Sequence, residues 1–174
     1  MFNDHSLLPK EAVRLAALGM VCESPRRYAA LANAVRDFTS RIVGPSLDLL
    51  GSSIELLKTE GLIAGEDEGG ALRITEAGRA HLQELLRSAV RAPNCDVGRL
   101  AFALKIRFLH HLPADEQRAQ TDRMIETCDA EIARLGDLEL EDRDDPGRFA
   151  GWLRHDIDLA RSRRDWLESL RGTL

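Results

Sequence analysis

The chain has 174 residues, 44% of them hydrophobic and 30% charged, and its formal net charge at pH 7 is −5. This length fits one domain or two small ones, and the hydrophobic fraction excludes a wholly disordered chain. The negative charge argues against a protein that binds polyanions through a general surplus of basic side chains. There is no apolar run of membrane-spanning length and no signal-peptide pattern, and the three scattered cysteines form no pair motif, so we expect a cytoplasmic protein without a membrane segment.

The charge is unevenly distributed along the chain. Residues 1–92 carry 11 basic and 12 acidic side chains, whereas residues 93–174 carry 13 basic and 17 acidic ones. Between residues 26 and 41 there are four arginines and one acid, Asp37. The sequence therefore predicts a basic patch in the first half, with a solvated face of ion-paired arginines as the alternative.

The first predicted helix runs from Pro9 to about Cys22. Proline is tolerated in the first helical turn, and Glu11 favours a helix N-terminus. The segment is apolar on nearly every side, which indicates burial on more than one side. Because the chain is small, we predict that a partner chain covers the second side and contacts Leu15 and Leu18.

Two more helices are predicted next. Ser24 and Pro25 are typical of a helix start, and the second helix is expected to end near Phe38. After a short connector, Ser46 is expected to cap a third helix, which ends at Gly61 in a left-handed conformation.

A β-hairpin is predicted after the third helix. Two short apolar runs, residues 62–64 and 71–74, flank an acidic loop that is rich in turn-forming residues. Thr75 is then expected to cap a fourth helix that reaches about Ala92, where Pro93 stops it.

The remainder of the chain is predicted to be helical. One helix is expected over residues 96–112, a second from Pro113 to about Gly136, and a third from about Pro146 to Arg171. Two of these helices carry stripes that indicate packing against other helices. The seam of the second consists of Thr121, Ile125, Cys128, Ile132 and Leu135. The stripe of the last consists of Trp152, Leu159 and Trp166, which repeat every seven residues.

The order of these elements predicts the fold class. Three helices, a hairpin and a fourth helix within about 90 residues are the arrangement of a winged helix-turn-helix domain, in which the third helix enters the DNA major groove. We therefore predict a mainly α protein. A winged helix-turn-helix domain with a small β-hairpin wing would occupy residues 1–92, and a C-terminal helical dimerisation domain residues 93–174.

Several motifs resemble those of a known family. L-L-K-T-E-G-L-I at residues 56–63 and L-R-I-T-E-A-G-R at residues 72–79 resemble the signature of PadR-like regulators, and L-A-A-L-G-M at residues 15–20 resembles that family's first helix. Residues 156–170 are similar to the C-terminal domain of its virulence-activator-alpha branch. The resemblance implies a cytoplasmic, homodimeric, ligand-responsive transcription factor, by default a repressor, that binds a pseudo-palindromic operator in double-stranded DNA.

The resemblance and the residue types together suggest the site residues. The side chains expected to contact the DNA backbone are Arg26, Arg27, Arg36, Arg41, Lys58 and Arg73. The small polar residues on or near the predicted recognition helix are Ser46, Ser52 and Ser53. The residues expected at the dimer interface are Leu15, Leu18, Ile125, Ile132, Trp152, Leu159 and Trp166. The residues expected around a small hydrophobic effector, with plain packing as the alternative, are Phe102, Phe108, Trp152 and Trp166.

Some residues depart from the pattern of the family. Gly51 stands where the family usually has an aromatic residue, and Asp48 and Glu55 lie on the predicted recognition helix. The expected wing tip consists of Glu66, Asp67 and Glu68. Because carboxylates are repelled by phosphate, the alternative function is a winged-helix protein–protein interaction module that does not bind DNA.

Other kinds of site find little support in the sequence. It contains no Gly-rich phosphate loop, no G-x-S-x-G and no H-E-x-x-H, so we expect neither enzymatic activity nor a cofactor. His110 and His111 are adjacent and would point about 100° apart on a helix, so no metal site is predicted. Cys95 is a candidate redox-sensing thiol, but nothing in the sequence supplies an activating partner.

Overall fold

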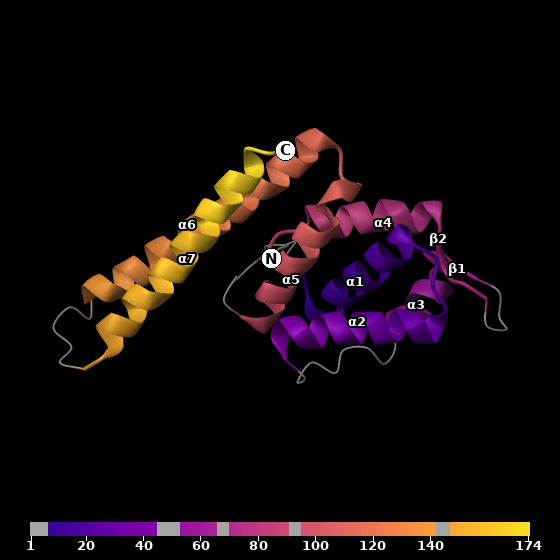
Figure 1. The fold of residues 1–174 in the computed structure, drawn as a ribbon, viewed down its shortest axis with the longest axis horizontal. Helices are drawn as coiled ribbons and strands as arrows, with labels where there is room; N and C mark the ends of the chain where they lie inside the picture. Colours follow the sequence, from indigo (N-terminus) through magenta and orange to yellow (C-terminus); the bar gives the residue numbers. More distant parts are fainter. Residues whose placement is uncertain (1–6, 45–52, 66–69, 91–94, 142–146) are drawn as a thin grey trace, which may run out of the picture. The chain divides into compact units, whose positions relative to one another are not determined.

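The computed structural model describes residues 7–44, 53–65, 70–90, 95–141 and 147–174, and these form two compact units (Figure 1). The first unit comprises residues 1–90 and 94–112, and the second comprises residues 91–93 and 113–174. The helix that follows residue 95 therefore belongs to the first unit, whereas the sequence analysis assigned it to the C-terminal domain. Among the described residues, no helix has both the length and the apolar character that a membrane span requires.

Helix α1 (Pro9–Glu23) forms the centre of the first unit. Its start is stabilised by Glu11, whose carboxylate accepts a 2.7 Å hydrogen bond from the Leu8 backbone N–H. Nine of its fifteen residues are buried, and both Leu15 and Leu18 are 0% exposed. Elements α2, α3, α4, α5 and β2 of the same chain surround it, and Figure 1 shows it between α2 and α4. The expectation that a partner chain covers its second side is thus corrected, because the chain covers that side itself.

Helix α2 (Tyr28–Val43) begins later and ends later than predicted. Ser24 has extended backbone angles and caps the end of α1 instead of starting α2. The extended link is fixed by pairing between Arg26 and Leu72, whose backbone groups exchange hydrogen bonds of 3.2 and 2.8 Å. The helix continues through the predicted connector because its buried stripe recurs every four residues to Val43, and Gly44, at φ +85°, ends it.

Helix α3 (Ser53–Thr59) leads into the wing. Strands β1 (Ile63–Ala64) and β2 (Arg73–Ile74) are antiparallel and pair Ile63 with Ile74. This confirms the predicted hairpin, and Gly61 ends the helix at φ +72° as expected. Several predicted positions lie outside the described residues: Ser46, Asp48, Gly51, Ser52, Glu66, Asp67 and Glu68.

Helix α4 (Glu76–Arg87) holds the wing against the body of the first unit. The Thr75 hydroxyl accepts a 3.0 Å hydrogen bond from the Gly78 N–H, which confirms the predicted cap, and donates to the Gly61 carbonyl at 2.8 Å. A Cβ on Gly78 would lie 2.0 Å from the Leu62 carbonyl oxygen, so only glycine permits this approach. The helix ends at Arg87 and not near Ala92.

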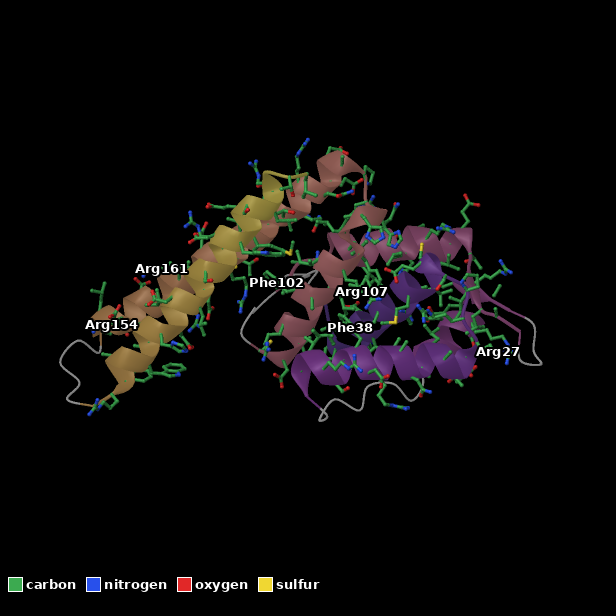
Figure 2. All side chains as sticks on the ribbon, in the orientation of Figure 1. Arg27, Phe38, Phe102, Arg107, Arg154 and Arg161 are labelled. Atoms are coloured by element: carbon green, nitrogen blue, oxygen red, sulfur yellow. The ribbon has the colours of Figure 1, made fainter. Side chains whose placement is uncertain are left out.

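Helix α5 (Asp96–Phe108) and the 3₁₀ turn η1 (Leu109–His111) complete the first unit, where the sequence predicted one uninterrupted helix. Gly19 of α1 gives room for the Phe108 ring, whose Cε2 would lie 2.5 Å from an added Cβ. The Arg107 guanidinium lies 5.1 Å from the centre of the Phe38 ring and pairs with Glu23 at 3.3 Å. Arg107 and Phe38 are labelled in Figure 2. These contacts join α5 to both α1 and α2.

Helices α6 (Ala114–Glu141) and α7 (Phe149–Arg171) pack together as the second unit. Helix α6 continues past Gly136, where the sequence predicted a loop. The buried seam of α7 consists of Leu153, Ile157, Ala160 and Leu167. On α6, the buried residues are Gln120, Thr121, Met124, Cys128, Glu131 and Leu135. Two ion pairs, Arg154 with Glu139 and Arg171 with Asp122, link the helices near opposite ends of α7.

Candidate nucleic-acid interface

The predicted recognition helix shows a clear division between core and solvent in its described part. Ile54 and Leu57 are 2% and 0% exposed and anchor α3 in the first unit. Glu55, Leu56 and Thr59 are exposed. Lys58, predicted to bind phosphate, is half-buried, and Ser53 begins the helix. The solvent side of this segment is therefore not basic.

Tyr28 is a candidate interface residue that the sequence analysis missed. It is the first residue of α2, it is 43% exposed, and its hydroxyl is hydrogen-bonded to Glu55 of α3. Burial, and after it the charge and hydrogen bond of Glu55, raise the pKa of the Tyr28 hydroxyl. In the sequence, the one indication of a role for Tyr28 was its position directly after two arginines. Its hydrogen bond to Glu55 depends on how α2 packs against α3, which the sequence does not show.

The structure brings three of the predicted arginines to the base of the wing. The backbone of Arg26 pairs with Leu72, which directly precedes Arg73 on β2. Arg27, at the start of α2, and Arg73 are exposed, whereas Arg26 is half-buried and its Nε donates to the Met20 carbonyl at 3.4 Å. Figure 2 shows Arg27 on the same side of the unit as the wing. Pairing between segments more than 40 residues apart thus gathers these side chains.

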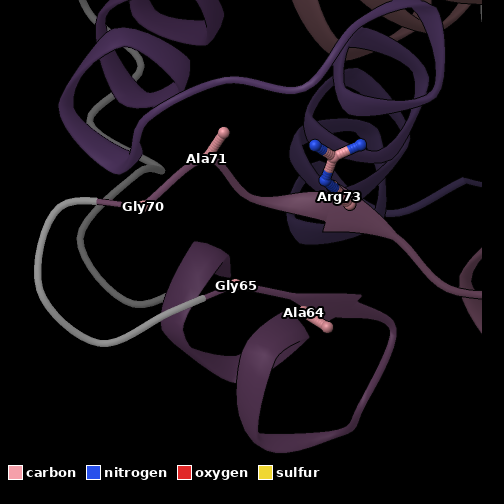
Figure 3. Close-up of a pocket in the computed structure, with 5 residues that line it drawn as sticks. All are labelled: Ala64, Gly65, Gly70, Ala71 and Arg73. Carbon is pink, nitrogen blue, oxygen red and sulfur yellow. The ribbon is translucent and has the colours of Figure 1, made fainter.

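A shallow pocket lies on the wing itself. It is lined by Ala64, Gly65, Gly70, Ala71 and Arg73 (Figure 3). Four of the five lining residues are alanine or glycine, so a partner could approach the wing backbone closely here. The Arg73 guanidinium is the cationic group of this lining, and its five N–H donors suit a phosphate oxygen.

The other two predicted arginines lie farther along α2. Arg36 and Arg41 are both exposed, and Arg36 donates to the Asn33 side chain at 3.3 Å. They are five positions apart in the sequence, which places them about 140° apart around the helix. The cluster of arginines in the sequence therefore does not form a single face.

An ionic network holds the end of α3 in place. The two terminal guanidinium nitrogens of Arg14, on α1, Nη1 and Nη2, donate to the Glu60 carboxylate, and the Nη1–Oε1 distance is 3.0 Å. The hydrogen bond from Arg14 is the largest cause of a lowered pKa at Glu60. His81 of α4 lies 3.3 Å from Arg14 and 3.1 Å from Glu84. These polar contacts fix the position of the end of α3 relative to α1 and α4.

The residues predicted to form a dimer interface fall into three groups. Leu15 and Leu18 are in the core of the first unit. Ile125 and Ile132 are half-buried on α6. Trp152, Leu159 and Trp166 are 51%, 52% and 52% exposed on α7. Of these predicted residues, only the last group lies fully at a surface.

The four aromatic residues proposed around an effector are also divided between the units. Phe102 and Phe108 are 8% and 0% exposed in the first unit, whereas Trp152 and Trp166 are on the surface of the second. The two phenylalanines therefore have a packing role within their own unit. In the part of the chain that the structure describes, no group of three or more histidine, cysteine or acidic residues could hold a metal ion.

Comparison with known proteins places the chain in a family. No curated protein sequence matches it. The crystal structure of Bacillus subtilis PadR is similar to it, with 17% sequence identity, a TM-score of 0.41 and 97% of each chain covered. A family model described as "Putative AphA-like transcriptional regulator" matches residues 2–171. The chain therefore belongs to the AphA-like transcriptional regulators, a PadR-like winged-helix family, in agreement with its sequence motifs.

Proposed function

We propose that the protein is a homodimeric, DNA-binding transcriptional repressor that holds the DNA backbone with the arginines at the base of its wing. The pairing of Arg26 with Leu72 is the observation that carries this proposal. It places Arg26 and Arg27 beside Arg73 of the hairpin, the element that contacts DNA in winged-helix domains. The negative charge of the whole chain does not oppose such binding, because a local cluster is enough to contact phosphates.

The three arginines have different expected contributions. Arg27 and Arg73 are exposed and free to reach phosphate oxygens, whereas Arg26 already donates to a backbone carbonyl. Sequence readout by the helix that includes Ser53 stays a prediction, as do the contacts of Ser46 and Ser52. Phosphate contacts supply affinity without sequence preference, so the arginines are the part of the interface that salt titration measures.

Dimerisation is proposed through the exposed stripe of α7. Trp152, Leu159 and Trp166 repeat every seven residues, and each keeps about half of its surface exposed in the single chain. A regular row of large apolar side chains on a helix is typical of a helical interface. Two subunits would present two wings to the two halves of a pseudo-palindromic operator.

Fluorescence anisotropy with DNA from the region upstream of the protein's own gene tests the proposal. Affinity should fall steeply between about 50 and 200 mM salt, because each phosphate contact contributes about −0.9 to the slope of log K against log salt. Arg27→Gln and Arg73→Gln should each weaken binding at all sequences and reduce that slope by about 1. Arg118→Gln, at an exposed position of α6, is the matched control and should change neither quantity. Absence of binding at about 50 mM salt would contradict the proposal.

A second candidate function is supported by the described part of α3. Glu55 and Leu56, both exposed, give the helix a surface that suits a protein partner better than a phosphate backbone. If the chain were a protein–protein interaction module, the same anisotropy experiment would show no salt-dependent binding. Leu56→Gln would then abolish partner binding, whereas it would have little effect on the salt dependence of a DNA complex.

A further inference from the structure

Three side chains from distant parts of the sequence meet at the end of α1. Cys22 is the penultimate residue of that helix and is partly exposed. The Nη1 of Arg79, on α4, donates a hydrogen bond to the Cys22 sulfur at 3.1 Å. The Nδ1 of His111, in η1, lies 3.8 Å from the same sulfur. The Cys22 sulfur is thus in contact with both a guanidinium and an imidazole nitrogen.

The arrangement is chemically suited to a nucleophilic thiol. The reactive form of cysteine is the thiolate, which neighbouring cationic side chains favour. Burial is the largest cause of a lowered pKa at His111, which favours the neutral ring, the form that can accept a proton. The carboxylate of Glu23, next to Cys22 in sequence, is paired with Arg107 at 3.3 Å. Its negative charge is therefore partly offset.

His111 has no competing role among the described residues. Its Nε2 atom is buried and has no hydrogen-bond partner in that part of the chain. The ring is held by stacking against Phe108, with ring centres 6.1 Å apart, and the Gln83 side chain donates to the His111 carbonyl at 3.2 Å. The imidazole is thus fixed in place with Nδ1 directed to the sulfur.

The other two cysteines lie in different described surroundings. Cys128 is 0% exposed, and burial raises the pKa of its thiol. Cys95 is exposed and accepts a 3.3 Å hydrogen bond from the Gly98 N–H at the start of α5. Cys22 differs from both in that the structure shows a histidine nitrogen and a guanidinium directly at its sulfur.

We propose that Cys22 is a modification site at which peroxides oxidise the thiol to sulfenic acid, with His111 as the base and Arg79 as the anion-binding group. The thiol gives its proton to Nδ1 of His111, and the thiolate attacks one oxygen of hydrogen peroxide. An S–O bond forms while the O–O bond breaks, and the leaving hydroxide takes the proton from the imidazolium and departs as water. Sulfur loses two electrons, which reduce the peroxide. The partial burial of Cys22 favours such a small oxidant.

The test is a rate measurement on the full chain, and it does not depend on DNA binding. The protein is exposed to hydrogen peroxide with dimedone present, and the adduct at each cysteine is measured over time by mass spectrometry of tryptic peptides. Cys22 should react fastest and Cys128 slowest. Arg79→Gln and His111→Gln should each slow labelling of Cys22 about tenfold and leave Cys95 unchanged. Arg79→Lys, which keeps the charge, should restore most of the rate.

Controls separate reactivity from folding. Arg118→Gln removes one exposed arginine elsewhere and should leave the Cys22 rate unchanged. Because Arg79 is exposed, the Arg79→Gln variant should fold even if a substitution at the half-buried His111 does not, and circular dichroism checks this. Equal Cys22 rates in the wild type and in Arg79→Gln would overturn the proposal. Faster labelling of Cys95 than of Cys22 would overturn it as well.

Discussion

Helices α1 and α7 both carry apolar side chains on more than one side. In the first unit these side chains are buried, whereas in the second unit one stripe of them remains exposed. Elements α2, α3, α4, α5 and β2 of its own unit pack around α1, and Leu15 and Leu18 are completely buried. Helix α7 has one helical neighbour in its unit, α6, which covers Leu153 and Leu167 but leaves Trp152, Leu159 and Trp166 exposed. The number of neighbouring elements therefore decides how much apolar surface a helix can bury.

This difference has a consequence for assembly. A two-helix hairpin buries one stripe on each helix, so a second apolar stripe remains available to another chain. A helix at the centre of a five-helix unit has no such surface left. Stability of the first unit should thus be a property of the single chain, whereas association should depend on α7. The following changes test that separation.

The largest effect is expected from Leu18→Ala. Removing this buried side chain should lower the free energy of unfolding by about 3 kcal/mol, because a cavity remains in the core. Urea denaturation followed by circular dichroism measures the loss. Leu159→Ala is the matched control on α7 and should cost below about 0.5 kcal/mol in the dissociated chain. A Leu18→Ala loss that is absent at low protein concentration and appears only as the concentration is raised would instead show that a partner buries this residue.

Gly19→Ala should have the next largest effect. Alanine is the better helix former by about 1 kcal/mol, but its Cβ would lie 2.5 Å from the Phe108 ring. We expect a net loss of about 2 kcal/mol in the free energy of unfolding, partly restored by Phe108→Leu. Gly151→Ala in α7 is the counterpart, because nothing lies within 4 Å of its Cβ. The Gly151→Ala variant should be more stable than the wild type. A lower free energy of unfolding would show that the Cβ at position 151 meets a neighbouring group and is not in open space.

Trp166→Gln should weaken association and leave the fold intact. Loss of a large apolar side chain from an interface should raise the dimer dissociation constant about tenfold, equivalent to 1.4 kcal/mol. Sedimentation equilibrium measures the constant. Arg161 lies about 140° around α7 from Trp166, so Arg161→Gln should leave the dimer dissociation constant unchanged. If neither variant changes the association, the stripe is not the interface.

The smallest effect on stability is expected from the ion pair between Arg14 of α1 and Glu60. Glu60→Gln removes the ion pair with Arg14 and should cost below about 1 kcal/mol, since Glu60 is largely exposed. The pKa of Glu60 is lowered in the folded state, so its stabilisation is present above the ordinary value of 4.5 and is lost as the pH falls through the lowered pKa. The difference between wild type and variant should persist from pH 7 to 4.5 and vanish below. A difference that grows at acid pH would contradict the ion pair.

Local signals predicted the wing well. Thr75 caps α4, and Gly61 has the left-handed conformation that terminates α3. Both were predictable because each depends on a side-chain or backbone preference that acts within a few residues. Ser24 and Pro25 gave an equally strong local signal that was wrong. The pairing of Arg26 with Leu72 holds that segment extended, and a contact between residues 46 positions apart is not visible in a local pattern.

The candidate sites show the same limit. The sequence placed Arg26, Arg27 and Arg73 in one functional set through their family positions, but only the wing pairing explains why they lie together. It singled out Cys95 as a candidate thiol and gave no reason to consider Cys22. The partners of Cys22, Arg79 and His111, are 57 and 89 residues away and come from other elements.

Helix caps, turn glycines and apolar periodicity act over a few residues, so they were enough to predict the order of the elements and the winged helix-turn-helix fold. The motifs at residues 56–63 and 72–79 indicated the family by resemblance. Tertiary structure alone decided which apolar stripe is buried, where α2 begins, and which cysteine lies beside a base and a cation. Those outcomes depend on which distant segments cover one another, and burial by a neighbouring element is a property of the packed chain.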